Sequence, residues 1–431
     1  MRNGSSSLSS AMDRRAFLRL SGVAAAGVAG ASFLAACTRK AESPPVDAPA
    51  ISAGIRNPIT LPIDPANPAI ESGLAPEKGA TLKVLEWREY LSHSVVKDFA
   101  DAHGIDFEIT SFENRDKGAS LIQNGGAFDI FFPTIDQLGS LVAAGLLQPL
   151  NHDYVPNVGR LWPQFAPPDG AFYDKGLRYS VPYTVFSTGI GWRSDLVAAR
   201  DAPPELDDPY SAYWNPRYRG KVGLYDDYRE AIATAILRTG STEVDTTDPS
   251  ILGAAREALR SLVDRVDPEF DTEGAYEGLP RGEFAIHQSW SGDILSAGRF
   301  GSAYTLGTAK DLRFYWPDDG RGIVGADLMA IPAKAPNPVL AHLFLNHMLD
   351  PKNALRNFAW NGYQPPVEGV TREALTSRSS LGHRIVPPNL ANALLSPGDV
   401  DRALTLRPQS PSAQNAWLDV WTTIGSPACV S

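Results

Sequence analysis

The feature that most constrains this chain is a regular alternation of short apolar segments and helical patterns in its first half. Segments with the character of buried strands cover residues 81–86, 105–110 and 128–132. Helical patterns follow them around residues 95–99, 116–123 and 135–144. Because strand–helix alternation brings strands side by side in one direction, it predicts a parallel sheet covered by helices.

The second half repeats this alternation without repeating the sequence. Strands are predicted at residues 221–225 and 284–288, and helices at 230–237, 251–263 and 339–349. Gly189 and Gly191 lack the third glycine of a dinucleotide-binding loop and instead predict a tight strand passage. The chain is therefore predicted to form two α/β lobes with a cleft between them, where sites gather at the carboxyl ends of strands.

An export signal is predicted at the N-terminus. Arg14 and Arg15 precede an uncharged run, residues 20–36, which ends in small residues directly before Cys37. This layout resembles a bacterial lipobox, in which Cys37 is acylated and begins the mature chain, and the paired arginines resemble a twin-arginine signal. The alternative is an N-terminal membrane anchor, because the run is near the lower limit of about 17 residues for a span. Either interpretation places the body outside the cytoplasm.

The remaining boundaries follow from composition and from the two-lobe interpretation. After a signal peptide of residues 1–36, a segment rich in Pro, Ala, Ser and Gly predicts a lipid-anchored flexible tether. The predicted parts are residues 37–79 for the tether, 80–186 with about 295–338 for lobe 1, and 187–294 with about 339–431 for lobe 2.

Charge and cysteine content exclude several classes of function. A formal charge of −10 argues against a nucleic-acid partner. Cys37 is assigned to lipidation, which leaves Cys429 without an obvious partner, so disulfides are not expected to hold the fold. The chain contains no His-Glu-x-x-His, Cys-x-x-Cys or Gly-x-Ser-x-Gly motif, so we expect no metal, cofactor or local nucleophile site.

Aromatic and acidic residues recur at predicted strand ends. They fall in residues 86–90, 133–136, 225–230 and 289–293, and Asp327 follows within an apolar segment where an unpaired charge is costly. Any one of these segments is more often structural, since aspartates cap helices and tryptophans fill cores. Together they suit a flexible alkylamine, because carboxylates bind ammonium groups and aromatic faces add cation–π attraction of about 0.5–2 kcal/mol.

These segments also carry a family resemblance. From about residue 82 to 420 the chain resembles the extracytoplasmic solute-binding proteins of ABC importers, specifically the spermidine/putrescine group. The motifs that carry the resemblance are residues 82–90, 128–134, 181–192, 213–222, 226–230 and 290–293.

The resemblance implies a two-lobed periplasmic-binding-protein fold of type II with the ligand cleft between the lobes. It implies a monomeric receptor without catalytic activity or cofactor, which passes a polyamine to ABC transporter permease subunits. It also implies the ligand-binding residues Trp87, Glu89, Tyr90, Thr134, Asp136, Asp227, Glu230, Trp290, Asp293, Asp327 and Tyr363.

Arg88 departs from the family pattern, which usually has a hydroxyl at this position. A polyamine remains the favoured ligand, with Arg88 facing solvent or paired with Glu89. One alternative is a receptor of the same fold in which Arg88 holds an amino-acid-like or anionic solute. A secreted lyase or hydrolase using Asp226, Asp227 or Glu230 as acid and base is less favoured, because no nucleophile or metal site accompanies them.

Overall fold

The structure is a computed structural model that describes residues 60–112, 115–167, 174–299, 301–317, 320–377 and 386–424. All of these residues belong to one unit, residues 48–431. The twin arginines, Cys37 and Cys429 lie outside the described residues. Within the described ranges, no helix combines the length and apolarity needed to span a bilayer.

The described strands form one nine-stranded sheet in the order β2-β1-β3-β9-β4-β7-β5-β6, with β8 also paired to β4. Strands β1, β2 and β3 are parallel, as are β5, β6 and β7, whereas β4 and β9 run antiparallel to their neighbours. The strands are β1 (Thr81–Trp87), β2 (Asp106–Phe112), β3 (Ile130–Phe131), β4 (Ser180–Arg193), β5 (Val222–Leu224), β6 (Glu269–Phe270), β7 (Ile286–Trp290), β8 (Leu312–Tyr315) and β9 (Ile323–Ala330).

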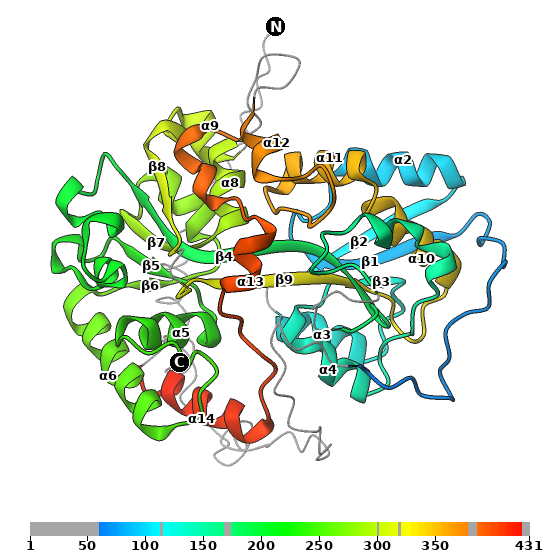
Figure 1. Cartoon of the computed structure of the whole chain (residues 1–431), viewed down its shortest axis with the longest axis horizontal. Helices are drawn as coiled ribbons and strands as arrows, with labels where there is room; N and C mark the ends of the chain where they lie inside the picture. The colour runs from blue at the N-terminus through cyan, green and yellow to red at the C-terminus, as the bar shows by residue number, and fades with distance from the viewer. Residues whose placement is uncertain are drawn as a thin grey trace, which may run out of the picture. The chain divides into compact units, whose positions relative to one another are not determined.

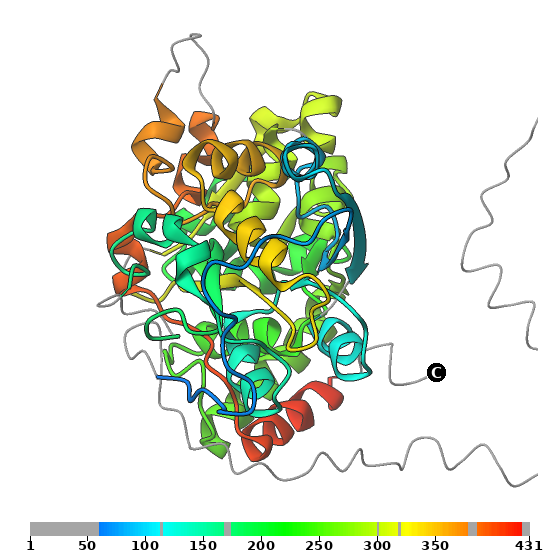
Figure 2. The ribbon, with the colours of Figure 1, turned by 90° about the vertical axis from the view of Figure 1, so that its right-hand side faces the viewer.

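Helices cover the sheet on both sides. In Figure 1, α2 and α11 lie on one side of β1–β3, and α3 and α4 lie on the other. Helix α14, in red, packs beside α5 and α6, as the perpendicular view also shows (Figure 2). The helices are α2 (His93–His103), α3 (Arg115–Gln123), α4 (Ile135–Ala143), α5 (Tyr228–Arg238), α6 (Pro249–Val266), α7 (Leu279–Arg281), α8 (Ser291–Arg299), α9 (Ser302–Leu306), α10 (Pro338–Met348), α11 (Pro351–Asn361), α12 (Arg372–Thr376), α13 (Pro397–Arg402) and α14 (Pro411–Thr422).

Two buried hydrophobic clusters flank the centre of the sheet, and β4 runs from one to the other. Val181 and Val185 of β4 belong to the first cluster, which also holds the cores of β1 and α10. Ile190 and Trp192 belong to the second, with the cores of α5 and α6. This arrangement agrees with the predicted α/β fold of two lobes, and the parallel sheet predicted for the first half is confirmed.

Gly189 and Gly191 allow neighbouring strands to approach β4 closely. A Cβ at Gly189 would lie 2.4 Å from the Tyr315 carbonyl oxygen of β8, and a Cβ at Gly191 would lie 2.4 Å from Ser289 Oγ of β7. A side chain at Gly189 would therefore push β8 away, and one at Gly191 would displace the Ser289 side chain. The tight strand passage predicted from these glycines is confirmed.

The C-terminal part of the predicted tether is bound to the body instead of being free. The Glu77 carboxylate accepts hydrogen bonds from the amides of Val339 and Leu340, and so caps the N-terminus of α10. The Tyr179 hydroxyl donates to the Pro62 carbonyl at 2.7 Å. Pro62 and Glu77 thus contact the body, although the sequence predicts a flexible tether over residues 37–79, and the extent of the tether stays a prediction.

The helices after residue 338 divide between the two halves. Helix α10 contacts the short helices η1 (His152–Tyr154) and η2 (Pro156–Arg160) of the first half, and α11 contacts α2 of the first half as well as α8. Helix α14 packs on α5 and α6 of the second half. The sequence had assigned all of these segments to lobe 2, and the contacts of α10 and α11 differ from that assignment. The other lobe boundaries stay a prediction.

Candidate ligand-binding site

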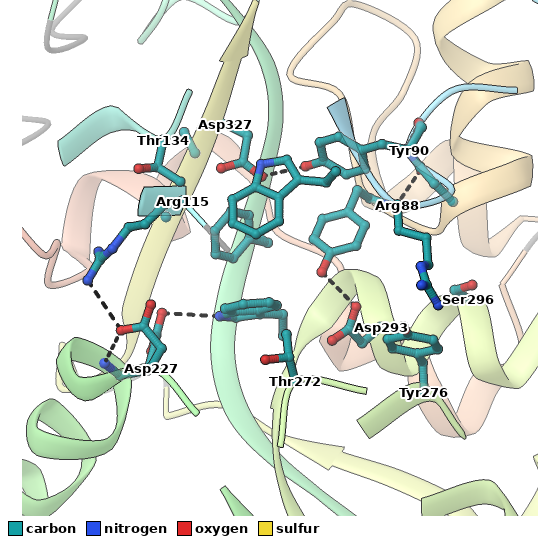
Figure 3. A pocket seen from close by; sticks show the side chains of 18 of the residues that line it. Arg88, Tyr90, Arg115, Thr134, Asp227, Thr272, Tyr276, Asp293, Ser296 and Asp327 are labelled. Carbon is teal, nitrogen blue, oxygen red and sulfur yellow. Dashed lines mark hydrogen bonds and ion pairs between the residues drawn. The ribbon is translucent and has the colours of Figure 1, made fainter. Parts of the chain in front are cut away.

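A cavity of about 650 Å³ lies where the two halves meet. Residues from β1, α3, α4 and β9 line it together with residues from the β5–α5 turn, β7 and α8. Every residue that the sequence placed in the ligand site, from Trp87 to Tyr363, lines this one cavity. Figure 3 shows several of them converging from different elements. The structure thus brings the predicted residues together, and their role in binding stays a prediction.

Aromatic rings form much of the cavity wall. Trp290, at the end of β7, stacks on Tyr225 with ring centroids 4.0 Å apart and an interplanar angle of 22°. Phe186 of β4 meets both Trp290 and Tyr363 edge to face. Trp87, at the end of β1, packs on Phe112 of β2. Within the described part of the chain, the buried Trp87 indole nitrogen has no hydrogen-bond partner.

Glu230 is a buried carboxylate beside these rings. Its Oε1 accepts hydrogen bonds from Trp290 Nε1 at 3.1 Å and from Thr188 Oγ1 at 3.2 Å. Its Oε2 is buried and has no hydrogen-bond partner among the described residues. Burial, and then the neighbouring charge of Asp227, raise the pKa of Glu230 to about 7. An ammonium group from a ligand would supply the missing partner and favour the ionised form.

Asp293 and Asp327 are buried and receive their hydrogen bonds from tyrosines. The Asp293 carboxylate accepts from the hydroxyls of Tyr225 at 2.6 Å and Tyr363 at 2.7 Å. Asp327 accepts from the Tyr90 hydroxyl. Burial raises the pKa of Asp293 to about 6 and that of Asp327 to about 7.

Asp136 and Asp227 are instead paired with arginines. Arg115 lies 2.9 Å from Asp136 and 3.5 Å from Asp227, and Arg229 lies 3.2 Å from Asp136. Burial alone would raise the pKa of Asp136, but the two guanidinium groups hold it below its ordinary value. Asp227 also caps α5 by accepting from the backbone amides of Arg229 and Glu230.

The turn after β1 brings two predicted residues, Glu89 and Tyr90, into the cavity through a strained backbone. Glu89 has a φ of 58°, a left-handed conformation that is uncommon for a residue with a side chain and that occurs often at functional sites. The Trp360 indole fixes this turn by donating to the Glu89 carbonyl at 3.0 Å. Arg88 of the same turn is about half exposed and forms an ion pair of 3.2 Å with Glu273.

Sequence reasoning missed several residues that line the cavity. Arg115 opens a helix with no distinctive motif, and Thr272, Glu273 and Tyr276 lie in or beside the irregular helix η7 (Gly274–Gly278). Only Arg229 carried a signal, because it lies inside the acidic segment 225–230. Its role depends on Asp136, which is distant in sequence. Within the described ranges, no group of three or more His, Cys, Asp or Glu side chains is arranged to hold a metal ion.

Comparison with known proteins identifies the family. Residues 94–380 match the family described as bacterial extracellular solute-binding protein. The chain belongs to this family. As a solute-binding protein it acts by binding outside the cytoplasm and not by catalysis, which agrees with the receptor predicted from the sequence.

Individual relatives support this assignment. The spermidine/putrescine-binding periplasmic protein 1 of Haemophilus influenzae is 28% identical over 277 residues, which is 64% of this chain and 72% of the relative. The PotD spermidine/putrescine substrate-binding protein of Streptococcus pneumoniae matches with a TM-score of 0.63 at 20% identity, over 80% of this chain and 98% of that protein. The TpPotD lipoprotein of Treponema pallidum matches with a TM-score of 0.64 at 20% identity, over 80% and 99%. The two structural matches support the two-lobed fold.

Proposed function

We propose that this solute-binding protein is the polyamine receptor of an ABC importer and delivers its ligand to the membrane permease. The observation that carries the proposal is the Glu230–Trp290 pair. A buried carboxylate oxygen that has no hydrogen-bond partner among the described residues lies beside an indole that lines the same cavity. An alkylammonium ion satisfies both groups, because it donates to the carboxylate and is attracted by the ring.

The remaining lining suits the rest of such a ligand. Asp293 and Asp327 add two carboxylates with no basic partner in the described part of the chain. Trp87, Phe186 and Tyr363 supply apolar walls for methylene groups. The Haemophilus influenzae and Streptococcus pneumoniae relatives are named for spermidine and putrescine, which supports the same class of ligand.

Ligand binding is proposed to favour closure of the two lobes. Cavity residues come from elements of both hydrophobic clusters, so a ligand that touches both lobes binds the closed state more tightly than the open one. Ion pairs that link the two halves, Arg88 with Glu273 and Arg115 with Asp227, would add to the closed state. The closed form is the one proposed to deliver the polyamine.

The receptor is further proposed to act as a monomer held at the membrane by a lipid on Cys37. The Leu-Ala-Ala-Cys sequence at residues 34–37 and the preceding apolar run support this anchor. An anchored receptor stays close to its permease, where each binding event can lead to transport.

Isothermal titration calorimetry against putrescine and spermidine tests the proposal. Stoichiometric binding of at least one of them, with no turnover of the ligand, is the expected result. Glutamate and arginine serve as amino-acid-like competitors. Binding of one of these, with no heat and no thermal shift from either polyamine at millimolar concentration, would show that the ligand belongs to a different class.

A further inference from the structure

Arg115 places a protein cation at one end of the cavity. It is the first residue of α3, and its side chain is only 13% exposed. Its guanidinium group lies 2.9 Å from Asp136, 3.5 Å from Asp227 and 5.2 Å from the centre of the Tyr228 ring. Two carboxylates and an aromatic face are also what an alkylammonium ion requires. Arg115 therefore occupies a position with the chemistry of a ligand-binding subsite.

The carboxylates at this end are already neutralised by the protein. Asp136 is paired with Arg229 as well as with Arg115, and accepts a hydrogen bond from the Thr134 hydroxyl. Arg115 stays in its ionised form. Burial alone would lower its pKa, but the negative charges of Asp227 and Asp136 raise it. A ligand ammonium placed here would meet a permanent like charge and would find both carboxylates already paired.

Three other carboxylates remain for the ligand. Glu230, Asp293 and Asp327 form no ion pair with a basic side chain among the described residues, and Glu230 Oε2 has no hydrogen-bond partner there. The Arg115 charge reaches Glu230 but is not its largest electrostatic influence, since burial and Asp227 act on its pKa more strongly. Figure 3 shows Arg115 and Asp227 at one end of the group, Asp293 and Tyr276 toward the other, and Asp327 between them. Only Glu230, Asp327 and Asp293 are thus left to attract ammonium groups. The part of the cavity available to them excludes the end at Asp136 and Asp227.

We infer that Arg115 is a specificity-determining residue that makes the pocket select a diamine over a triamine. The guanidinium group takes the place of the terminal ammonium that a longer polyamine would bring against Asp136 and Asp227. The two ammonium groups of a diamine bind within the span of Glu230, Asp327 and Asp293. This inference rests on the proposed polyamine function and deepens it by naming the class of polyamine.

The test compares putrescine with spermidine by titration calorimetry on the wild-type protein and on Arg115→Met. The wild type is expected to bind putrescine about tenfold more tightly than spermidine, because repulsion of about 1.4 kcal/mol already produces that ratio. Arg115→Met removes the cation while keeping much of the side-chain volume. Its preference is expected to move toward spermidine by about tenfold or more.

Two further variants separate the charge from other effects. Arg115→Lys keeps the cation and should keep the preference for the diamine. Arg160→Met removes an arginine from an exposed ion pair with Glu368 that does not line the cavity, and should leave the ratio of the two affinities unchanged. If Arg115→Met does not fold, Arg115→Gln still tests the inference. The ratio of putrescine affinity to spermidine affinity in the wild type tests it as well.

The outcomes distinguish this inference from the proposed function. A wild-type protein that binds spermidine more tightly than putrescine overturns the inference and leaves polyamine binding intact. An unchanged ratio in folded Arg115→Met does the same. A wild-type protein that binds neither amine overturns the proposed function, and the inference with it.

Discussion

Trp290, at the end of β7, stacks on Tyr225, which follows β5, with ring centroids 4.0 Å apart and an interplanar angle of 22°. One face of the indole is therefore already covered by the protein, while its nitrogen is held by Glu230 at 3.1 Å. The ring is fixed before any ligand arrives, so little side-chain entropy is lost on binding. A ligand must use the part of Trp290 that remains at the cavity wall.

Replacing Trp290 with Ala should weaken polyamine binding by a factor of about 2 to 30, because a cation–π contact contributes about 0.5–2 kcal/mol. Trp290→Phe keeps a ring but loses the hydrogen bond to Glu230, so it should lie between the wild type and the alanine variant. Trp421→Ala is the control for general destabilisation, because Trp421 packs on Phe270 outside the cavity. Titration calorimetry measures the differences, and equal affinities for wild type and Trp290→Ala would remove Trp290 from the site.

Asp293→Asn should weaken amine binding by about tenfold or more, since removing one partner of a buried charge pair costs a few kcal/mol. The amide oxygen can still accept a hydrogen bond from Tyr225, and the amide NH2 can donate to the Tyr363 hydroxyl, so the fold should be retained. Asp98→Asn, in a half-exposed pair with Arg356 on the protein surface, serves as the matched control. A folded Asp293→Asn with wild-type affinity would contradict this assignment.

Cys37→Ala should block acylation and release the exported body from the membrane, because lipid attachment requires the thiol. Membrane fractionation and the mass of the mature protein measure the effect. The same acyl mass on the Cys37→Ala body would contradict the lipobox.

Replacing Arg14 and Arg15 with Lys should leave the precursor inside the cell, because the paired arginines resemble a twin-arginine export signal. Unchanged export in cells without the twin-arginine translocase would indicate the general secretory route.

The sequence predicted which residues meet in the cavity better than it predicted how they pair. Strand ends are visible as apolar segments followed by polar residues, and parallel strands bring such ends together, so Trp87, Asp227 and Trp290 could be placed in one site. The partners of Asp136 and Asp227 could not be predicted, because Arg115 is distant in sequence and carries no local pattern. The contacts of Pro62 and Glu77 with the body could not be predicted for a similar reason. Hydrogen bonds that involve backbone groups leave no periodic pattern in the sequence.

Arg88→Ser should change polyamine affinity by less than about fivefold, because ion pairs between exposed side chains contribute roughly 0–1 kcal/mol. Arg88 and Glu273 are both about half exposed, so solvent screens the charge of Arg88 toward a ligand. Calorimetry at low and high salt measures the effect. A large gain in polyamine affinity would mean that Arg88 opposes the ligand directly, and loss of an anionic solute would mean that it anchors one.

Polyamine affinity should rise with pH between about 5 and 8, because the site acids must be ionised to bind ammonium groups. Burial raises the pKa of Glu230 and Asp327 to about 7 and that of Asp293 to about 6, so these groups are largely protonated at the lower pH. Binding near neutral pH should therefore release protons, which calorimetry in buffers of different ionisation enthalpy detects.

The same pKa shifts act in the opposite direction on the stability of the free protein. Because the folded-state pKa of Glu230 lies above its ordinary value of 4.5, its contribution to stability is fully present below that value and is lost as pH rises toward 7. Glu230→Gln should remove part of this loss and flatten the pH dependence of binding. Thermal unfolding from about pH 5 to 8, with and without putrescine, measures both effects. If Glu230→Gln has the same pH profiles as the wild type, the buried carboxylate does not control ligand binding.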